Sequence, residues 1–118
     1  MALDCDRDTI LVTVKQRGEF CHKGTYSCFG DARGLARLAR TIADRGKNPL
    51  HGSYTTKLLD DPSLLECKLL EEAGELSEEG ADIVHEAADL LYHTMVRIQA
   101  MEVSLADVQA ELDRRSRT

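Results

Sequence analysis

The sequence has no tryptophan, few aromatic residues and no long apolar run. Only 4% of its 118 residues are aromatic whereas 42% are hydrophobic, which suits aliphatic helix packing better than an aromatic-rich β-sandwich. No apolar segment approaches the roughly 20 residues that a membrane-spanning helix needs. The first residues contain no basic segment followed by an apolar one, so we see no secretory signal. These absences predict a mainly α-helical, cytoplasmic protein with no membrane partner.

Positive charge is also scarce, with 15 Lys and Arg against 21 Asp and Glu and a net charge of −6. Such a surface argues against non-specific nucleic-acid binding, which needs basic side chains to displace the counterions of the phosphates. It leaves a phosphate ligand open, because bound divalent cations can reverse the local field. A chain of this length buries a limited core alone, so we expect a homodimer.

The chain changes character about a third of the way along. Residues 9–15 are β-branched and apolar and predict a strand in a short N-terminal β segment. Residues 31–45 have apolar side chains at helical spacing, with Asp31 as the expected N-cap. We expect three parts: residues 1–45, a linker at 46–52, and a helical domain at 53–118.

The helical domain carries the start and stop signals of four helices. Ser53, Asp61 and Ser104 are N-cap residues by type and position, and Asp107 completes a short capping box with Ser104. Gly80 can adopt the left-handed conformation that ends many helices. The expected helices run from Ser53 to Leu59, from Asp61 to about Glu79, from about Ala81 to Met101, and from Ser104 onward.

Eight acidic residues and no Lys or Arg lie between Leu69 and Val96. Many of them share one stripe of a helix, because residues three or four apart lie on the same face. The stripes are Lys68, Glu72, Glu75 and Glu79 in the first helix, and Asp82, Glu86, Asp89 and His93 in the second. If the chain turns back at Gly80, two carboxylate pairs come to nearly the same height.

Four carboxylates that face one space repel one another unless cations lie between them. Oxygen-only ligands favour Mg²⁺ or Mn²⁺ over softer metals. Mg²⁺ usually takes its remaining ligands from water and substrate phosphates, which suits metal-assisted phosphate chemistry. An exposed acidic helix pair with no ligand is the alternative. The expected ligands are Glu72, Glu75, Glu86 and Asp89.

Two strings in this region, Lys68-Leu-Leu-Glu-Glu-Ala-Gly-Glu75 and Glu86-Ala-Ala-Asp-Leu-Leu-Tyr-His93, resemble the phosphoribosyl-ATP pyrophosphohydrolases of histidine biosynthesis. That family belongs to the all-α superfamily that includes the MazG-like enzymes. Ser53–Leu58 matches the start of the domain and Val103–Val108 its final helix, so the resemblance covers about residues 53–116. It implies a helical, usually dimeric fold. It also implies Mg²⁺-dependent cleavage of phosphoribosyl-ATP to phosphoribosyl-AMP and pyrophosphate.

Under this resemblance the four carboxylates bind Mg²⁺, and further side chains are candidates for contacts with substrate. Glu71 could orient the attacking water, although its side chain should point about 100° away from that of Glu72. Lys57 and Lys68 are candidate phosphate contacts, Tyr54 could stack on a base, and His93 could orient a phosphate. Each has a structural alternative: an exposed carboxylate, solvated lysines, a packed tyrosine and a satisfied interface histidine.

The N-terminal string Asp4-Cys-Asp-Arg-Asp8 places three carboxylates at alternate positions. In an extended strand they point to one side and can collect a hard cation. Cys5, Cys21 and Cys28 provide three thiolates with one position left for water, a catalytic-zinc pattern. Three ordinary buried thiols are the alternative.

These residues, with Phe20–Gly24 and Ser27–Phe29, resemble the C-terminal part of phosphoribosyl-AMP cyclohydrolase, the next enzyme of that pathway. The resemblance implies that Zn²⁺ is bound by Cys5, Cys21 and Cys28, with Cys5 donated across a dimer. It also implies a second Mg²⁺ site and an acid–base candidate, formed by Asp4, Asp6 and Asp8 and by His22 respectively.

That family has a substantial β-rich segment before the aspartate motif, which starts here at residue 4. We therefore expect the trailing end of a bifunctional cyclohydrolase–pyrophosphohydrolase, with ring opening absent or very weak. Two other functions stay open. One is a MazG-like pyrophosphatase of ordinary or damaged nucleoside triphosphates, and the other is a non-catalytic zinc-binding dimerisation module.

Overall fold

The structure is a computed structural model that describes residues 2–3, 5, 10–11 and 33–116. The chain divides into two units, Met1–Ala32 and Arg33–Thr118. In the first unit, strand β1 (Ala2–Leu3) pairs antiparallel with β2 (Ile10–Leu11), with Ala2 opposite Leu11. Strand β2 falls inside the strand predicted at residues 9–15. The rest of that prediction lies outside the described residues.

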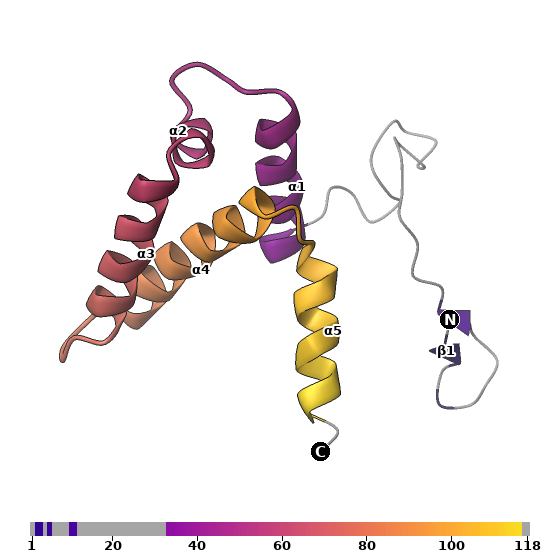
Figure 1. Cartoon of the computed structure of the whole chain (residues 1–118). Helices are drawn as coiled ribbons and strands as arrows, with labels where there is room; N and C mark the ends of the chain where they lie inside the picture. Colours follow the sequence, from indigo (N-terminus) through magenta and orange to yellow (C-terminus); the bar gives the residue numbers. More distant parts are fainter. Residues whose placement is uncertain (1, 4, 6–9, 12–32, 117–118) are drawn as a thin grey trace. The chain divides into compact units, whose positions relative to one another are not determined.

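The second unit is helical, as the sequence predicts. Its helices are α1 (Gly34–Lys47), α2 (Tyr54–Asp60), α3 (Pro62–Leu76), α4 (Ile83–Ala100) and α5 (Leu105–Ser116). Helices α3 and α4 form an antiparallel pair joined by the loop of residues 77–82, and α1 packs on α4 (Figure 1). Across the described residues, no helix combines the length and the apolar character that crossing a bilayer requires.

Helix α1 belongs to this helical unit. It packs against α2 and α4 and places Ile42 in the core. The boundary before Arg33 therefore differs from the one predicted at residue 45, and α1 extends into the predicted linker. The prediction of Asp31 as the N-cap was wrong, because Arg33 is the N-cap of α1 and makes no side-chain capping bond. Residue type favoured Asp31, whereas the helix begins three residues later.

The other predicted N-caps are confirmed. Ser53 Oγ and Asp61 Oδ1 each accept from the backbone N–H three residues on, at 3.4 and 3.1 Å. At the start of α5, Ser104 Oγ accepts from the Asp107 N–H at 3.1 Å, and Asp107 Oδ2 accepts from the Ser104 N–H at 3.3 Å. These side chains satisfy N–H groups at the helix starts locally, so these helices begin where short-range chemistry dictates.

The α3–α4 connection is longer than predicted. Helix α3 ends at Leu76 instead of about Glu79, and α4 begins at Ile83 instead of Ala81. Asp82 is the N-cap of α4, where its Oδ1 accepts a backbone N–H at 3.2 Å. Asp82 and Glu79 therefore do not extend the acidic stripes, because the N-cap preference of aspartate outweighs the helical periodicity. Gly80 lies within the loop at φ +80°.

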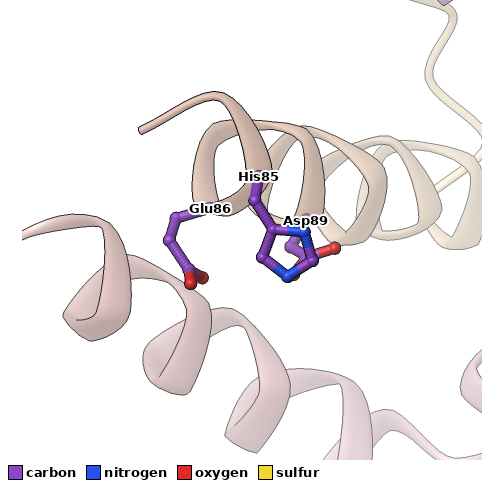
Figure 2. A group of neighbouring side chains, drawn as sticks. All are labelled: His85, Glu86 and Asp89. Atoms are coloured by element: carbon purple, nitrogen blue, oxygen red, sulfur yellow. The ribbon is translucent and has the colours of Figure 1, made fainter. Parts of the chain in front are cut away.

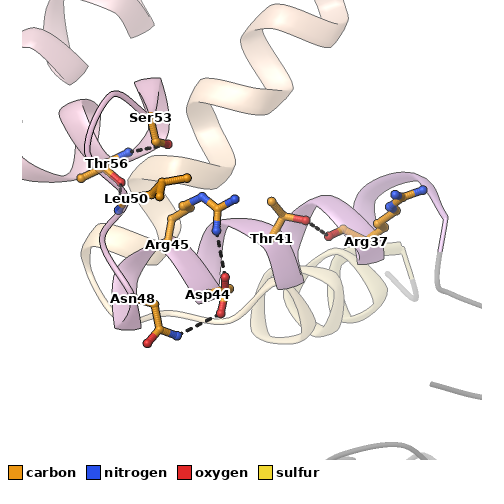
Figure 3. A network of polar contacts seen from close by, with 8 residues as sticks. All are labelled: Arg37, Thr41, Asp44, Arg45, Asn48, Leu50, Ser53 and Thr56. Atoms are coloured by element: carbon orange, nitrogen blue, oxygen red, sulfur yellow. Dashed lines mark hydrogen bonds and ion pairs between the residues drawn. The ribbon is translucent and has the colours of Figure 1, made fainter. Parts of the chain in front are cut away.

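A polar network holds the connection between α1 and α2 (Figure 3). Asn48 Nδ2 donates to Asp44 Oδ1 at 3.0 Å, and Arg45 pairs with the other Asp44 oxygen at 2.9 Å. Beyond the bend, the Leu50 N–H donates to Thr56 Oγ1 at 3.1 Å. These bonds set the start of α2 and hence the position of its first side chains.

The hydrophobic core of the described residues is small. Helices α1 to α4 contribute its five buried members, which are Ile42, Leu58, Leu65, Met95 and Val96. Helix α5 has no buried residue, although Leu105 packs against this core. Much apolar surface therefore stays exposed within a single copy of the chain.

Candidate metal centre

Carboxylates from α3 and α4 converge where the two helices pack together. Glu72, Glu75 and Glu86 each offer a ligand oxygen within 4.8 Å of the others. Asp89 follows Glu86 by three residues, and its charge acts on both Glu72 and Glu86. We call these four residues the carboxylate cluster. Three of the four predicted ligands thus share one group, and the binding of a metal by the four residues stays a prediction.

Two oxygens of the cluster lack partners. Glu72 is only 8% exposed, and its Oε2 is shielded from solvent with no hydrogen-bond partner in the described part of the chain. Glu86 Oε2 is likewise shielded from solvent and has no hydrogen-bond partner there. Burying an ionised oxygen without a partner is costly, and a cation removes that cost. An oxygen-only cluster with two unpaired, buried oxygens fits a hard divalent cation such as Mg²⁺.

The cluster also shifts the pKa values of its members. Burial raises the pKa of Glu72, and the hydrogen bond and charge of Glu75 and the charge of Asp89 raise it further. Burial and the same contacts with Glu75 raise the pKa of Glu86. Without a cation, protons therefore remain on the cluster to higher pH than on ordinary carboxylates. A bound cation would compete with those protons.

His85 was not selected from the sequence. It lies in the first turn of α4, and its Nε2 is 3.3 Å from Asp89 Oδ2. His85, Glu86 and Asp89 together offer ligand atoms within 4.8 Å of one another (Figure 2). The i,i+4 spacing between His85 and Asp89 was the available signal, because such residues are neighbours on a helix.

His93 and Tyr54 contact each other across α4 and α2. The buried His93 has Nδ1 2.7 Å from the Asp89 carbonyl oxygen and Nε2 3.1 Å from the Tyr54 hydroxyl. A carbonyl oxygen only accepts, so Nδ1 carries a proton, and in the neutral imidazole Nε2 then accepts from Tyr54. The Tyr54 ring stacks on Tyr92, with centroids 6.2 Å apart. Both nitrogens of His93 are therefore satisfied within the protein.

The remaining substrate candidates lie around the cluster and not in it. Lys68 Nζ pairs with Glu71 Oε2 at 3.1 Å, and Glu71 is exposed. Lys68 lies close enough for its charge to act on Tyr54. Lys57 is exposed on α2 and lines a surface hollow with Tyr54. The structure thus brings Glu72, Glu75 and Glu86 into one ligand group and places Asp89 in the other, with His85 and Glu86. Glu71, Lys57 and Lys68 lie outside both groups.

The N-terminal metal predictions fall almost entirely outside the described residues. Cys5 is exposed, and it belongs to neither of the metal-ligating groups found in the described part of the chain. The other residues of the predicted zinc and second magnesium sites, and the acid–base candidate, lie outside that part: Asp4, Asp6, Asp8, Cys21, His22 and Cys28. These assignments stay predictions.

Comparison with known proteins gives two family matches. Residues 35–116 match the model of phosphoribosyl-ATP pyrophosphohydrolase, and residues 1–30 match that of phosphoribosyl-AMP cyclohydrolase. The first match begins 18 residues before the resemblance expected from position 53, so it includes α1. The larger match thus coincides with the helical unit that holds the carboxylate cluster.

Several curated proteins align with nearly the whole chain. The histidine biosynthesis trifunctional protein of Neurospora crassa is 42% identical over 118 residues, covering 98% of this chain and 14% of that protein. The histidine biosynthesis bifunctional protein his7 of Schizosaccharomyces pombe is also 42% identical, covering 98% and 28%. The histidine biosynthesis bifunctional protein HisIE of Lactococcus lactis is 37% identical over 129 residues, covering 98% and 60%. The chain thus spans between about a seventh and three fifths of these relatives.

Proposed function

Because this chain belongs to the phosphoribosyl-ATP pyrophosphohydrolase family, we propose that its helical unit hydrolyses phosphoribosyl-ATP to phosphoribosyl-AMP and pyrophosphate in histidine biosynthesis. The observation that carries the proposal is the carboxylate cluster between α3 and α4. Its two buried, unpaired oxygens belong to Glu72 and Glu86, one from each helix. An exposed acidic helix pair without a ligand gives no reason for carboxylate oxygens to be buried without partners.

In this function, Glu72, Glu75, Glu86 and Asp89 would hold Mg²⁺. A bound Mg²⁺ offsets charge on the phosphates and makes a bound water a better nucleophile. Glu72 is buried, whereas Glu75 and Asp89 are partly exposed. We therefore place the polyphosphate on the side of Glu75 and Asp89, with Glu72 as the inner anchor of the cluster.

The residues around the cluster have roles that suit a nucleotide substrate. Lys68 lies near both Tyr54 and Glu72, and its Nζ is held by Glu71. A phosphate carries more charge than the Glu71 carboxylate, so we propose that Lys68 exchanges Glu71 for a substrate phosphate. We retain Lys57 and Tyr54 as weaker candidates for substrate contacts. His93 is better suited to hold α2 against α4, because both of its nitrogens are already paired.

We also propose that two copies of the chain associate through apolar surface on α3 and α4. Val84 is 82% exposed, and Leu91, seven residues on, lies on the same face of α4 and is also exposed. Leu70 on α3 is another large exposed apolar side chain. Several exposed apolar side chains on a chain with a small core are typical of a subunit interface. A homodimer therefore agrees with the exposed residues.

Pyrophosphate release from phosphoribosyl-ATP, ATP and dATP, measured with Mg²⁺, tests the proposal. We expect phosphoribosyl-ATP to be the preferred substrate and Glu75→Gln to slow its hydrolysis by about 10²–10³-fold. Glu66→Gln is the matched control, because Glu66 is exposed on the same helix and lies outside the cluster. Preference for ATP or dATP would indicate a MazG-like enzyme instead. No release from any of the three would indicate a non-catalytic module.

A further inference from the structure

We propose that the chain has a second cation position, formed by His85, Glu86 and Asp89, that takes a divalent transition metal such as Mn²⁺. This position adjoins the oxygen-only position between Glu72, Glu75 and Glu86 and shares Glu86 with it. Asp89, one of the four ligands proposed above for Mg²⁺, then binds the second ion. The proposal deepens the proposed function, since it concerns the metals of the same site.

The three side chains already have the spacing of ligands to one ion. They lie at i, i+1 and i+4 in the first turns of α4, and their ligand atoms are all within 4.8 Å (Figure 2). His85 Nε2 and Asp89 Oδ2 are 3.3 Å apart. Two atoms bound to one metal at about 2.0–2.1 Å, at angles of about 90–110°, are roughly 2.8–3.4 Å apart. Little side-chain movement is therefore needed for both to bind the same ion.

The unpaired oxygen of Glu86 also fits a carboxylate that two ions share. Glu86 is the one residue common to both groups of ligands found in the described part of the chain. Its Oε2 is shielded from solvent and unpaired there, as is Oε2 of Glu72, whose side chain is 8% exposed and belongs to the adjoining group. A carboxylate that bridges two neighbouring cations uses both of its oxygens, as in two-metal phosphoryl-transfer sites. A bridging role for Glu86 therefore accounts for an oxygen that the protein leaves without a partner.

The two positions differ in the metal they prefer. The first offers only carboxylate oxygens, the ligands of Mg²⁺, whereas the second adds an imidazole nitrogen. Imidazole favours transition metals over Mg²⁺. His85 is 67% exposed, so an ion can enter this position from solvent. We therefore expect a mixed site, with Mg²⁺ held by oxygens alone and a transition metal held partly by nitrogen.

Electron paramagnetic resonance of Mn²⁺ bound to the full chain, without substrate, tests the proposal. We expect His85→Gln to bind about one Mn²⁺ fewer per chain than the wild type. We also expect spin-echo modulation from a directly bound imidazole nitrogen in the wild type and none in His85→Gln. Glutamine has no ring nitrogen but keeps a polar group near Asp89. Circular dichroism of each variant confirms that the helices are retained.

Two further variants fix the interpretation. His51→Gln replaces an exposed histidine outside the cluster, so it should keep both the Mn²⁺ count and the nitrogen signal. Glu72→Gln removes a ligand of the other position, so it should keep the nitrogen signal. A wild type without nitrogen modulation, or modulation that survives in His85→Gln, overturns the proposal. Because no substrate is present, a failure of the proposed hydrolysis would leave this result unchanged.

Discussion

Replacing Glu72 by glutamine should stabilise the metal-free protein and remove its stabilisation by Mg²⁺. Glu72 is 8% exposed and offers an oxygen within 4.8 Å of those of Glu75 and Glu86. Burial, followed by the neighbouring Glu75, raises the pKa of Glu72, so the ionised form is disfavoured at this position without a cation. Glutamine keeps the size of the side chain, removes its charge and supplies an N–H donor. The same change thus relieves repulsion and removes a metal ligand.

The size of this effect follows from the spacing of the charges. Two unit charges 4.8 Å apart repel by about 3.5 kcal/mol at an effective dielectric constant of about 20, and by about 0.9 kcal/mol in bulk water. Glu75 and Glu86 are partly exposed, so screening reduces the gain to about 1–2 kcal/mol. A change of 1 kcal/mol shifts the Tm of a domain of this size by about 4–8 °C. The metal-free variant should therefore melt about 5–10 °C above the wild type.

Mg²⁺ should reverse this order. At a hundred times its Kd, a ligand that binds only the native state stabilises it by about 2.7 kcal/mol. The wild type should gain that amount and Glu72→Gln almost none. Thermal unfolding near neutral pH, followed by circular dichroism in chelator and in Mg²⁺, measures both effects. Glu66→Gln should match the wild type in each buffer. The reasoning fails if Glu72→Gln melts below the wild type in chelator and gains equally from Mg²⁺.

Three other predictions concern acidity, helix packing and assembly. Burial raises the pKa of Glu72 and Glu86, so the native state binds protons more tightly than the unfolded state. In chelator, the free energy of unfolding measured in urea should rise as the pH falls from about 7 to about 5, and it should rise less in Glu72→Gln. A free energy of unfolding that falls over that range would contradict this. Tyr54→Phe leaves Nε2 of the buried His93 without its donor and should cost about 1–2 kcal/mol in urea unfolding, so a variant as stable as the wild type would refute the assigned bond. Leu91→Glu should halve the mass measured by light scattering, whereas a wild type that is already monomeric would refute the proposed interface.

Much of the helical unit was predictable because its signals act over a few residues. Ser53, Asp61 and Ser104 cap helices through bonds to N–H groups three residues away, and those bonds follow from residue type. The boundary of α1 was not predictable in this way. Local periodicity identifies the helix, but its membership of the helical unit depends on contacts with α4, which is distant in sequence. Asp82 fits both the helical spacing of the acidic stripe and the residue preference for an N-cap, and in the structure it is the N-cap of α4.

The same distinction applies to the metal centre. Spacing along each helix predicts that Glu72 and Glu75 share a face and that Glu71 points elsewhere, and the burial of Glu72 beside the exposed Glu71 agrees with it. The partner of His93 could not be read from spacing, because Tyr54 lies 39 residues away. His85 lies off the stripe that joins Glu86, Asp89 and His93, although its i,i+4 relation to Asp89 is visible in the sequence.

The central claim is that the carboxylate cluster holds the cation on which hydrolysis depends. The rate of pyrophosphate release from phosphoribosyl-ATP, measured across a range of Mg²⁺ concentrations for the wild type and Glu86→Gln, tests it most directly. We expect saturable dependence on Mg²⁺ in the wild type, complete loss in chelator, recovery when Mg²⁺ is restored, and release slower by about 10²-fold or more in the variant at every concentration. Release that persists in chelator, or a variant as fast as the wild type, would contradict the claim.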